Sequence, residues 1–322
     1  GLPHVELSIP PESLPEMVTD FVDCYEQPYA DSSGLPSMLL CRNVRDYVTV
    51  ALCGDGGDEF FGGYRRYSWM ANAMRARRFP RTFRRLAGGL LGLHGSLKAR
   101  RIQRVLDLQD EGGIYAELFL GWWPDGADSV LNGVSTSSDA PAQLIRDVFS
   151  KLDANGVSDP ISKAQCADAS FYLPDCLQVK MDRAAMRYSL EVRCPLLDYR
   201  VASAGARLSR EARTGDSPKQ VLKKLLGRHI PRETFERPKQ GFGVPMQQWL
   251  RGPLRELMID TLNAQSFREC GWLRHDKLQS MLTGFENGEH WRATHLWMFL
   301  SLALSLERHA KTNSSLIDLR AA

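Results

Sequence analysis

The sequence predicts an α/β protein in which an incomplete parallel sheet is followed by a mostly α-helical region. The first observation is the apolar, β-branched run Val48–Leu52, which is typical of a strand buried on both faces. The second is the helical periodicity from about residue 69 onward, which short Gly and Pro clusters divide into pieces. We therefore expect residues 1–68 to be the remnant of the α/β core and residues 69–322 to be its helical continuation.

The elements before residue 69 follow a βα alternation. Residues 4–9 alternate weakly and predict a strand, and the periodicity predicts a helix over roughly 12–25. A loop dense in turn formers, residues 26–33, leads into a second helix at about 34–46 and then into the strand at 48–52. This order predicts a parallel sheet, of which the chain holds one or two strands.

Composition indicates a soluble globular protein. The 322 residues are 43% hydrophobic and 25% charged, with a net charge of +3. Seven cysteines are scattered without C-x-x-C spacing, which favours reduced thiols in a cytoplasmic protein. The longest apolar run, residues 296–306, is too short for a membrane span and predicts a buried helix. The chain begins at Gly1 without a Met, and we expect it to be a fragment.

The loop after the predicted strand has the residue types that hold a metal-bound nucleotide. Glycines allow several backbone N–H groups to point into one concavity, and three carboxylates follow the carboxyl end of the strand. The residues concerned are Gly54, Gly56 and Gly57, and Asp55, Asp58 and Glu59. Mutual repulsion of the carboxylates is offset by a hard cation, so the loop predicts Mg²⁺ with a nucleotide. The alternative is a solvated turn, which the ordered flanks disfavour.

A second segment rich in charges runs from residue 172 to residue 200. Its apolar residues fit one helical face, beside charges that indicate a bound polar ligand or a solvated face; the apolar set is Leu177, Met181, Ala184, Ala185 and Tyr188. Glu191, Arg193 and Asp198 are interpreted as a structural salt-bridge turn. Asp175 follows a proline and is either a helix N-cap or a ligand for an α-amino group, and the cap is favoured.

A third segment, residues 230–245, places Lys239 on a loop between two prolines and two glycines. A cation on a stiffened loop suits a phosphate or a developing negative charge, because it needs little ordering when the ligand arrives. The alternative is an ordinary exposed lysine.

Together these segments resemble the synthetase domain of the asparagine synthetase (glutamine-hydrolysing) family. The resemblance extends from the N-terminus to about residue 255 and rests on three motifs in family order: CGDGGDEFFGGYRRY, YLPD followed by VKMDRAAM and EVRCPLLD, and ERPKQGFGVP followed by QQWL. It implies an ATP-pyrophosphatase fold (adenine nucleotide alpha hydrolase-like). It further implies that ATP activates the aspartate side chain as an adenylate, and that ammonia from an N-terminal glutaminase domain displaces AMP.

The resemblance also assigns roles to residues of this chain. Asp58 would hold Mg²⁺ on the pyrophosphate, Asp55 would be the acid/base residue of the amination step, and Lys239 would steady the phosphates and the tetrahedral intermediate. The remaining roles are nucleotide binding by Gly54, Asp55 and Gly56, and amino-acid substrate binding by Glu59 and Asp175. Adenylation needs a metal and a cation on the departing pyrophosphate, and amination needs a carboxylate to take a proton, so the physical interpretation agrees.

The chain departs from the family pattern in two main respects. The Ser-Gly-Gly-x-Asp-Ser phosphate loop and the glutaminase domain with its N-terminal cysteine are absent from this sequence. A smaller departure is Gln27, where a Glu-Pro pair is common. We therefore expect the parent protein to be the ligase, acting on aspartate, ammonia and ATP and forming a homodimer, and we expect this fragment to be inactive alone.

Two alternatives remain open at this point. One is an enzyme on the same scaffold that amidates or cyclises another carboxylic acid, such as a β-lactam-type synthetase. The other is a non-catalytic module that binds RNA through residues 65–104, where twelve Lys or Arg and no acid occur. The aromatic residues there, Tyr67, Trp69, Phe79 and Phe83, are spaced as in helix packing, which makes nucleic acid the less favoured partner.

Overall fold

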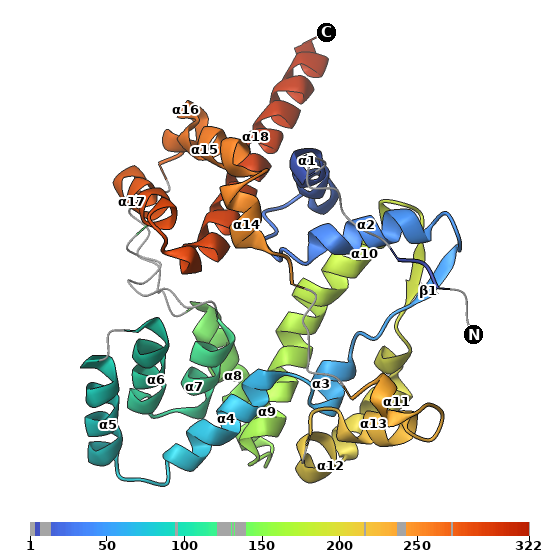
Figure 1. Cartoon of the computed structure of the whole chain (residues 1–322), viewed down its shortest axis with the longest axis vertical. Helices are drawn as coiled ribbons and strands as arrows, with labels where there is room; N and C mark the ends of the chain where they lie inside the picture. The colour runs from blue at the N-terminus through green and yellow to red at the C-terminus, as the bar shows by residue number, and fades with distance from the viewer. Residues whose placement is uncertain are drawn as a thin grey trace.

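The computed structural model describes residues 4–6, 14–93, 96–120, 130, 132, 140–215, 217–236, 243–271 and 273–321. Figure 1 shows helices gathered in two groups around a long central helix, with β1 at the side. The helices are α1 (Leu14–Tyr25), α2 (Gly34–Val44), α3 (Gly57–Phe61), α4 (Arg65–Ala76), α5 (Arg81–Leu93), α6 (Leu97–Asp107), α7 (Glu111–Phe119), α8 (Ala140–Ala154), α9 (Pro160–Ala167), α10 (Val179–Met186), α11 (Tyr199–Arg207), α12 (Arg210–Thr214), α13 (Gln220–Leu226), α14 (Met246–Arg251), α15 (Arg255–Asn263), α16 (Gln265–Arg268), α17 (His275–Glu286) and α18 (Ala293–Ala321). The strands are β1 (Val50–Leu52) and β2 (Glu191–Arg193), and η3 (Asp168–Gln178) is a π-helix.

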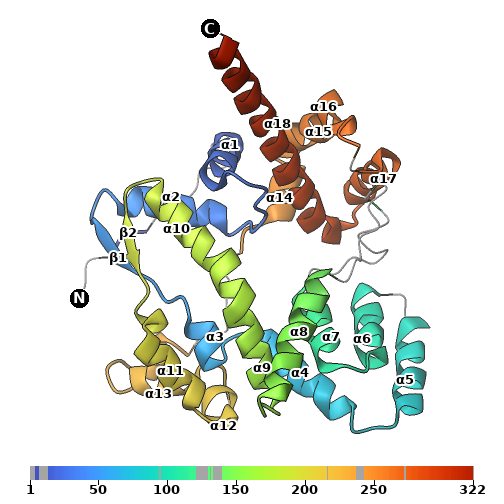
Figure 2. The same ribbon diagram turned by 180° about the vertical axis from the view of Figure 1, so that it is seen from behind.

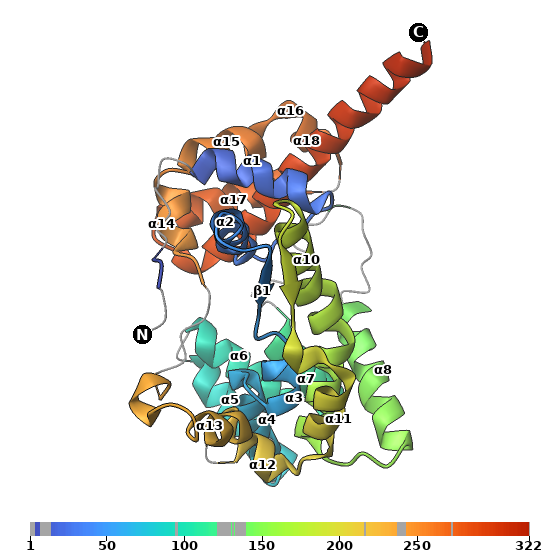
Figure 3. The same cartoon turned by 90° about the vertical axis from the view of Figure 1, so that its right-hand side faces the viewer.

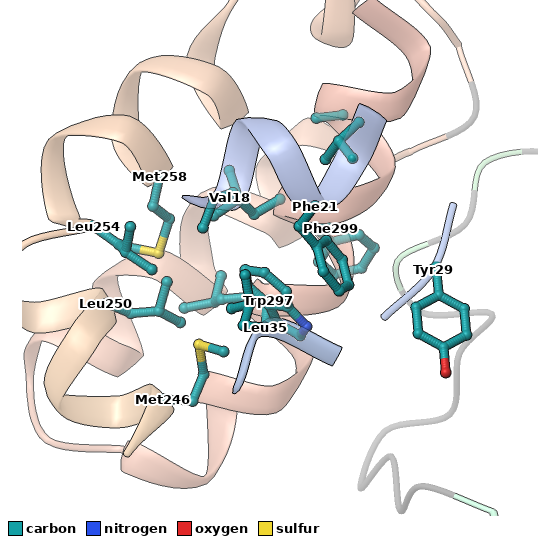
Figure 4. Packing of buried hydrophobic residues seen from close by; sticks show 14 of the residues in the cluster. Val18, Phe21, Tyr29, Leu35, Met246, Leu250, Leu254, Met258, Trp297 and Phe299 are labelled. Atoms are coloured by element: carbon teal, nitrogen blue, oxygen red, sulfur yellow. The ribbon is translucent and has the colours of Figure 1, made fainter. Parts of the chain in front are cut away.

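The first core joins the N-terminal helices to the C-terminal ones. Val18 and Phe21 of α1 pack beside Leu35 of α2, Leu250 of α14 and Trp297 of α18 (Figure 4). Each such side chain contributes about 1.5–3 kcal/mol when fully buried. The helices expected over 12–25 and 34–46 are therefore confirmed with shorter bounds.

The C-terminal helix α18 covers this core. Leu296 and Leu300 are fully buried, as predicted for the apolar run 296–306. The indole Nε1 of Trp297 donates to the backbone O of Ala30 at 2.9 Å, which fixes the loop before α2 to α18. Within the described part of the chain, no helix combines the length and the apolar character needed to cross a bilayer.

The two strands form a parallel pair, which confirms the predicted parallel sheet, although the segment of β2 was interpreted from the sequence as part of a salt-bridge turn. Val50 lies opposite Glu191 and Leu52 opposite Arg193, and β1 emerges between the two groups of helices (Figure 3). The prediction that this strand is buried on both faces is wrong, because Val50 is 39% and Leu52 72% exposed. In the described residues β1 has a partner along one edge and is not enclosed by two helical layers. Residues 4–6 form no strand, and residues 7–9 of the expected first strand lie outside the described residues.

A continuous helical rod formed by α9, η3 and α10 crosses the molecule (Figure 2). Its buried Asp168 accepts hydrogen bonds from Arg66 Nη2 at 2.8 Å and from the hydroxyls of Tyr67 and Tyr115 at 2.6 Å each. These bonds attach the rod to α4 and α7. A second core lies between α4, α7, α8 and α9 and includes Met70, Ile114 and Ile161. The rod therefore connects this second core, through α9, with the first core, to which Ala184 and Ala185 of α10 belong.

The basic stretch of residues 65–104 folds into α4, α5 and most of α6. Several of its arginines bond within the molecule: Arg84 donates to the backbone O of Leu106 at 2.9 Å, and Arg101 to that of Glu117 at 2.8 Å. Tyr67 is buried as helix packing requires, but Trp69, Phe79 and Phe83 are 42%, 60% and 62% exposed, so the packing prediction is wrong for these three. Phe79 precedes α5, and its ring stacks on that of Phe83 with the centroids 6.2 Å apart.

The coarse fold prediction is confirmed as a helix-rich α/β structure with a small parallel sheet. The ATP-pyrophosphatase fold, and the division of the chain at residue 68, stay predictions.

Candidate active site

The acidic loop, residues 53–59, begins where β1 ends and leads directly into α3. Gly56 has a φ of +87°, and a Cβ at this position would overlap Cδ2 of Leu197. A Cβ on Gly57 would lie 2.9 Å from Cδ1 of Leu196. Leu196 and Leu197 lie shortly after the end of β2. The acidic loop after β1 and the segment after β2 therefore pack on one another. Glycine is required here for backbone conformation and for close approach.

Asp55 is half-buried and carries an oxygen without a partner. Its Oδ2 is shielded from solvent and has no hydrogen bond among the described residues. Burial raises the pKa of Asp55 above its ordinary value, while the Cys53 thiol and the positive charge of Lys180 lower it. A carboxylate held in this way titrates closer to neutral pH than an exposed aspartate, which suits a proton acceptor.

Asp58 faces a lysine that the sequence interpretation did not single out. Lys219 Nζ lies 3.1 Å from Asp58 Oδ2, and both side chains are partly exposed. Lys219 itself has a φ of +57° at the start of α13. It follows Ser217-Pro218, and the argument applied to Lys239, a cation on a stiffened loop, could have identified it.

A second lysine approaches the loop from α10. Lys180 Nζ lies 3.3 Å from Asp31 Oδ2 and donates to Ser33 Oγ at 2.9 Å, with its side chain only 12% exposed. The positive charge of Lys180 lowers the pKa of Asp55, so the turn-rich loop 26–33, α10 and the acidic loop meet here. The sequence left open whether the charges of this segment bind a polar ligand or lie on a solvated face. With 12% of its side chain exposed, Lys180 does not lie on a solvated face.

Glu59 is enclosed rather than open to solvent. It is 1% exposed, its Oε1 accepts from the Tyr64 hydroxyl at 2.5 Å, and its backbone O accepts from Gln165 Nε2 at 2.6 Å. Burial raises the pKa of Glu59, and the Tyr64 hydrogen bond lowers it. The side chain of Glu59 therefore links α3 to Tyr64, the residue before α4, and its backbone O links α3 to α9.

The favoured interpretation of Asp175 as an N-cap is wrong. Asp175 lies inside η3, directly after Pro174, and its side chain is exposed. The rod runs through this position without a helix start, because α9, η3 and α10 are consecutive. The ligand interpretation stays a prediction, and Lys239 lies outside the described residues.

The charges near β2 are structural, as predicted, with a change of partners. Glu191 Oε1 pairs with Arg193 Nε at 2.6 Å, whereas Asp198 binds Arg200 at 2.8 Å and caps α11. Arg200 was not part of the predicted set.

The assembled site has four charged groups around the end of β1: the carboxyl groups of Asp55 and Asp58 and the ammonium groups of Lys180 and Lys219. The donor set fits Mg²⁺ through the carboxylate of Asp58, since this ion usually takes one or two protein carboxylates and obtains its other ligands from phosphates and water. The lysines fit phosphate or carboxylate groups. The predicted Gly54, Asp55, Gly56 and Asp58 thus come together, Glu59 is enclosed behind them, and Asp175 lies exposed on the rod.

The fold and this loop define a helix-rich α/β protein with an acidic, lysine-flanked site at the end of a parallel strand. A family model described as asparagine synthase matches residues 1–308, so the chain belongs to the asparagine synthase family. This confirms the resemblance found in the three motifs.

Curated relatives agree with the family assignment. The chain is 29% identical over 272 residues to a putative asparagine synthetase [glutamine-hydrolyzing] of Mycobacterium tuberculosis, covering 82% of this chain and 40% of that protein. It is 26% identical over 260 residues to asparagine synthetase [glutamine-hydrolyzing] 1 of Bacillus subtilis, covering 80% of this chain and 40% of that protein. The chain therefore spans about 40% of the length of these relatives.

Proposed function

We propose that the protein containing this chain is an ATP-dependent ligase that converts aspartate into asparagine. In the proposed reaction the aspartate side-chain carboxylate attacks the α-phosphate of ATP, giving a β-aspartyl-adenylate and pyrophosphate. Ammonia derived from glutamine in a glutaminase domain then displaces AMP. The observation that carries the proposal is the acidic loop after β1, with Lys219 on Asp58 and Lys180 beside Asp55.

Asp58 and Lys219 are assigned to the phosphates. Mg²⁺, held by Asp58, would neutralise charge on the departing pyrophosphate. Lys219 Nζ is 3.1 Å from Asp58 Oδ2 in the structure and is partly exposed, so it is within reach of a phosphate oxygen placed at the loop. A fixed ammonium group stabilises charge that develops on the leaving group. Lys239 is assigned the same task.

Asp55 is assigned to the amination step. Attack by neutral ammonia on the adenylate carbonyl gives a tetrahedral intermediate with a positively charged ammonium nitrogen. A carboxylate must accept one proton from this nitrogen before AMP departs. The partner-free Oδ2 of Asp55 is an available acceptor. Lys180 favours the ionised carboxylate, which keeps the base active at neutral pH.

The other predicted residues have supporting roles in this proposal. The backbones of Gly54 and Gly56 would lie against the nucleotide, and Asp175, exposed on η3, would meet the α-amino group of aspartate. Glu59 would act on the amino-acid substrate through Tyr64, because its own carboxylate is enclosed. The glutaminase domain, a homodimer and a cytoplasmic location belong to the same proposal.

The test separates adenylation from amination in the full-length gene product. ATP–pyrophosphate exchange that depends on aspartate reports the adenylate, and asparagine formation from ammonium chloride reports the second step. Lys219→Met should lower exchange by about 10²–10³-fold, the usual effect of losing one charge-stabilising donor. Asp55→Asn should lower ammonia-dependent synthesis far more than exchange.

The matched control is Lys224→Met, on an exposed position of the same helix as Lys219. It should leave exchange within about twofold of the wild-type value. Equal losses in the two lysine variants would contradict the assignment of Lys219. Exchange stimulated by a different carboxylic acid, and not by aspartate, would favour the amidotransferase or β-lactam-type alternative on the same scaffold.

A further inference from the structure

Two cysteines, one directly after each strand, lie side by side at the end of the sheet. Leu52 and Arg193 lie opposite one another in the parallel register, and Cys53 and Cys194 are the residues that follow them. The backbone N–H of Cys53 donates to the O of Arg193 at 2.9 Å, which extends the pairing to this position. The Sγ atoms of Cys53 and Cys194 are 2.9 Å apart.

This arrangement suits a disulfide in several respects. Neighbouring strands lie about 4.8 Å apart, within the range of about 4.4–6.8 Å between Cα atoms that disulfides span. The sulfurs need to approach by less than about 1 Å to reach the bond length of about 2.05 Å. Of the seven cysteines, all within the described part of the chain, Cys53 and Cys194 are the two whose sulfurs are in contact.

The Asp55 carboxylate lies with both sulfurs in one group, all three ligand atoms being within 4.8 Å of one another. A soft metal ion is the competing occupant of such a group. Two sulfurs bound to tetrahedral zinc at about 2.3 Å lie about 3.8 Å apart, which is wider than the observed 2.9 Å. The observed separation is about 0.9 Å from either geometry, so the number of ligands decides between them. Structural zinc sites use four protein ligands, whereas this group supplies three among the described residues, which favours the disulfide.

We propose that Cys53 and Cys194 are a site of reversible oxidation, at which hydrogen peroxide converts the two thiols into a disulfide that ties the acidic loop to the segment after β2. One thiolate attacks the peroxide and becomes a sulfenic acid, releasing one water after protonation. The second thiol displaces the sulfenic oxygen as a second water, so the peroxide is reduced and the two sulfurs are oxidised.

The position of this bond gives it a consequence for the loop. The residues directly after the pair, Gly56 and Leu197, are already in contact, so a bond at Cys53 would fix both segments at their starting point. It would also remove the Cys53 thiol, whose interaction lowers the pKa of Asp55. This consequence rests on the proposed function, under which we expect the oxidised loop to bind ATP poorly.

Burial sets the speed of the reaction. Burial, with a contribution from the Cys194 hydrogen bond, raises the pKa of the Cys53 thiol to about 12. The thiolate is the reactive form, so this thiol reacts slowly at neutral pH. The pair is therefore expected to respond to sustained exposure to peroxide.

The first experiment maps disulfides in the reduced 322-residue chain after treatment with hydrogen peroxide and alkylation of remaining thiols. Mass spectrometry of unreduced peptides should find Cys53 joined to Cys194, with the link lost after dithiothreitol. Cys194→Ser should abolish the link, and Cys166→Ser, which removes an exposed thiol, should leave it unchanged. Folded wild-type protein in which Cys53 and Cys194 remain alkylated, or pair with other cysteines, would overturn the proposal. The wild-type map decides the question even if a variant does not fold.

The second experiment measures aspartate-dependent ATP–pyrophosphate exchange in the full-length protein before and after oxidation. We expect at least a tenfold loss that dithiothreitol reverses, and no loss on oxidation of the Cys194→Ser variant relative to its own reduced form. A mapped disulfide with unchanged exchange would refute the effect on the loop. Absence of exchange in the reduced protein would count against the proposed function and leave the disulfide map as an independent result.

Discussion

Replacing Gly56 with alanine tests the geometry of the acidic loop most directly. The φ of +87° costs an L residue about 1–2 kcal/mol. The overlap of the new Cβ with Leu197 adds about 1–3 kcal/mol, as in overpacked cores. Alanine also restricts the unfolded chain, which returns about 0.4–1 kcal/mol. The expected net loss is about 1–5 kcal/mol.

Two glycines of the same chain supply matched controls. Gly156 has a φ of +79° with open space around its Cβ position, so Gly156→Ala contains the backbone strain without the overlap and should cost about 0–2 kcal/mol. Gly54 has no positive φ and no neighbour within 4 Å, so Gly54→Ala should change stability only through the unfolded chain, with a gain of about 0.4–1 kcal/mol. The three variants therefore separate strain from overlap.

Urea denaturation followed by circular dichroism measures these differences. Relative to Gly54→Ala the unfolded-chain term cancels, and strain and overlap leave about 2–5 kcal/mol. With an m value of about 3 kcal/mol/M, Gly56→Ala should therefore lower the midpoint by about 0.7–1.7 M relative to Gly54→Ala. A midpoint for Gly56→Ala equal to that of Gly156→Ala would mean that Leu197 does not press on the loop. A midpoint equal to that of Gly54→Ala would refute the left-handed conformation as well.

Three further substitutions test other contacts. Lys180→Met should move the acid limb of the pH–rate profile of asparagine synthesis to higher pH, because losing the positive charge raises the pKa of Asp55 and the base works only when ionised. Ser33→Ala, which keeps the charge of Lys180, should leave the acid limb in place. Asp168→Asn should lower the free energy of unfolding by about 3–5 kcal/mol, since it leaves the buried guanidinium of Arg66 without its counter-charge, and an unchanged urea midpoint would contradict this. Trp297→Phe should lower the free energy of unfolding by about 1–3 kcal/mol in the same assay, through loss of the hydrogen bond to Ala30. A loss within about 0.5 kcal/mol, roughly the effect of a surface substitution, would contradict the importance of that hydrogen bond.

Much of the local structure could be predicted because its causes are local. Helical periodicity located α1 and α2, and the run of apolar residues identified the buried part of α18. The order of elements predicted a parallel sheet, but the partner of β1 is β2, a segment that was interpreted as part of a salt-bridge turn. The exposure of β1 could not be predicted, since a β-branched run has the same pattern whether or not two helical layers cover it.

The candidate site was predicted in part for the same reason. Asp55 and Asp58 lie within one short loop, so their proximity is encoded locally. Lys219 and Lys180 reach that loop from α13 and α10, and a single sequence gives no distance between such segments. Asp175 was misplaced because a proline usually marks a helix start, whereas here η3 continues through Pro174.

The register of two short strands explains how the separate motifs form one site. Because Leu52 lies opposite Arg193, the CGDGGD and CPLLD segments leave the sheet side by side and in the same direction. The charges of the second segment are structural, as Asp198 bonds to Arg200, yet its Leu196 and Leu197 form the wall that requires glycine at 56 and 57. A shift of one residue in this register would separate Cys53 from Cys194 and remove Leu197 from Gly56 together. The disulfide map and the Gly56→Ala measurement therefore test the same register by independent means.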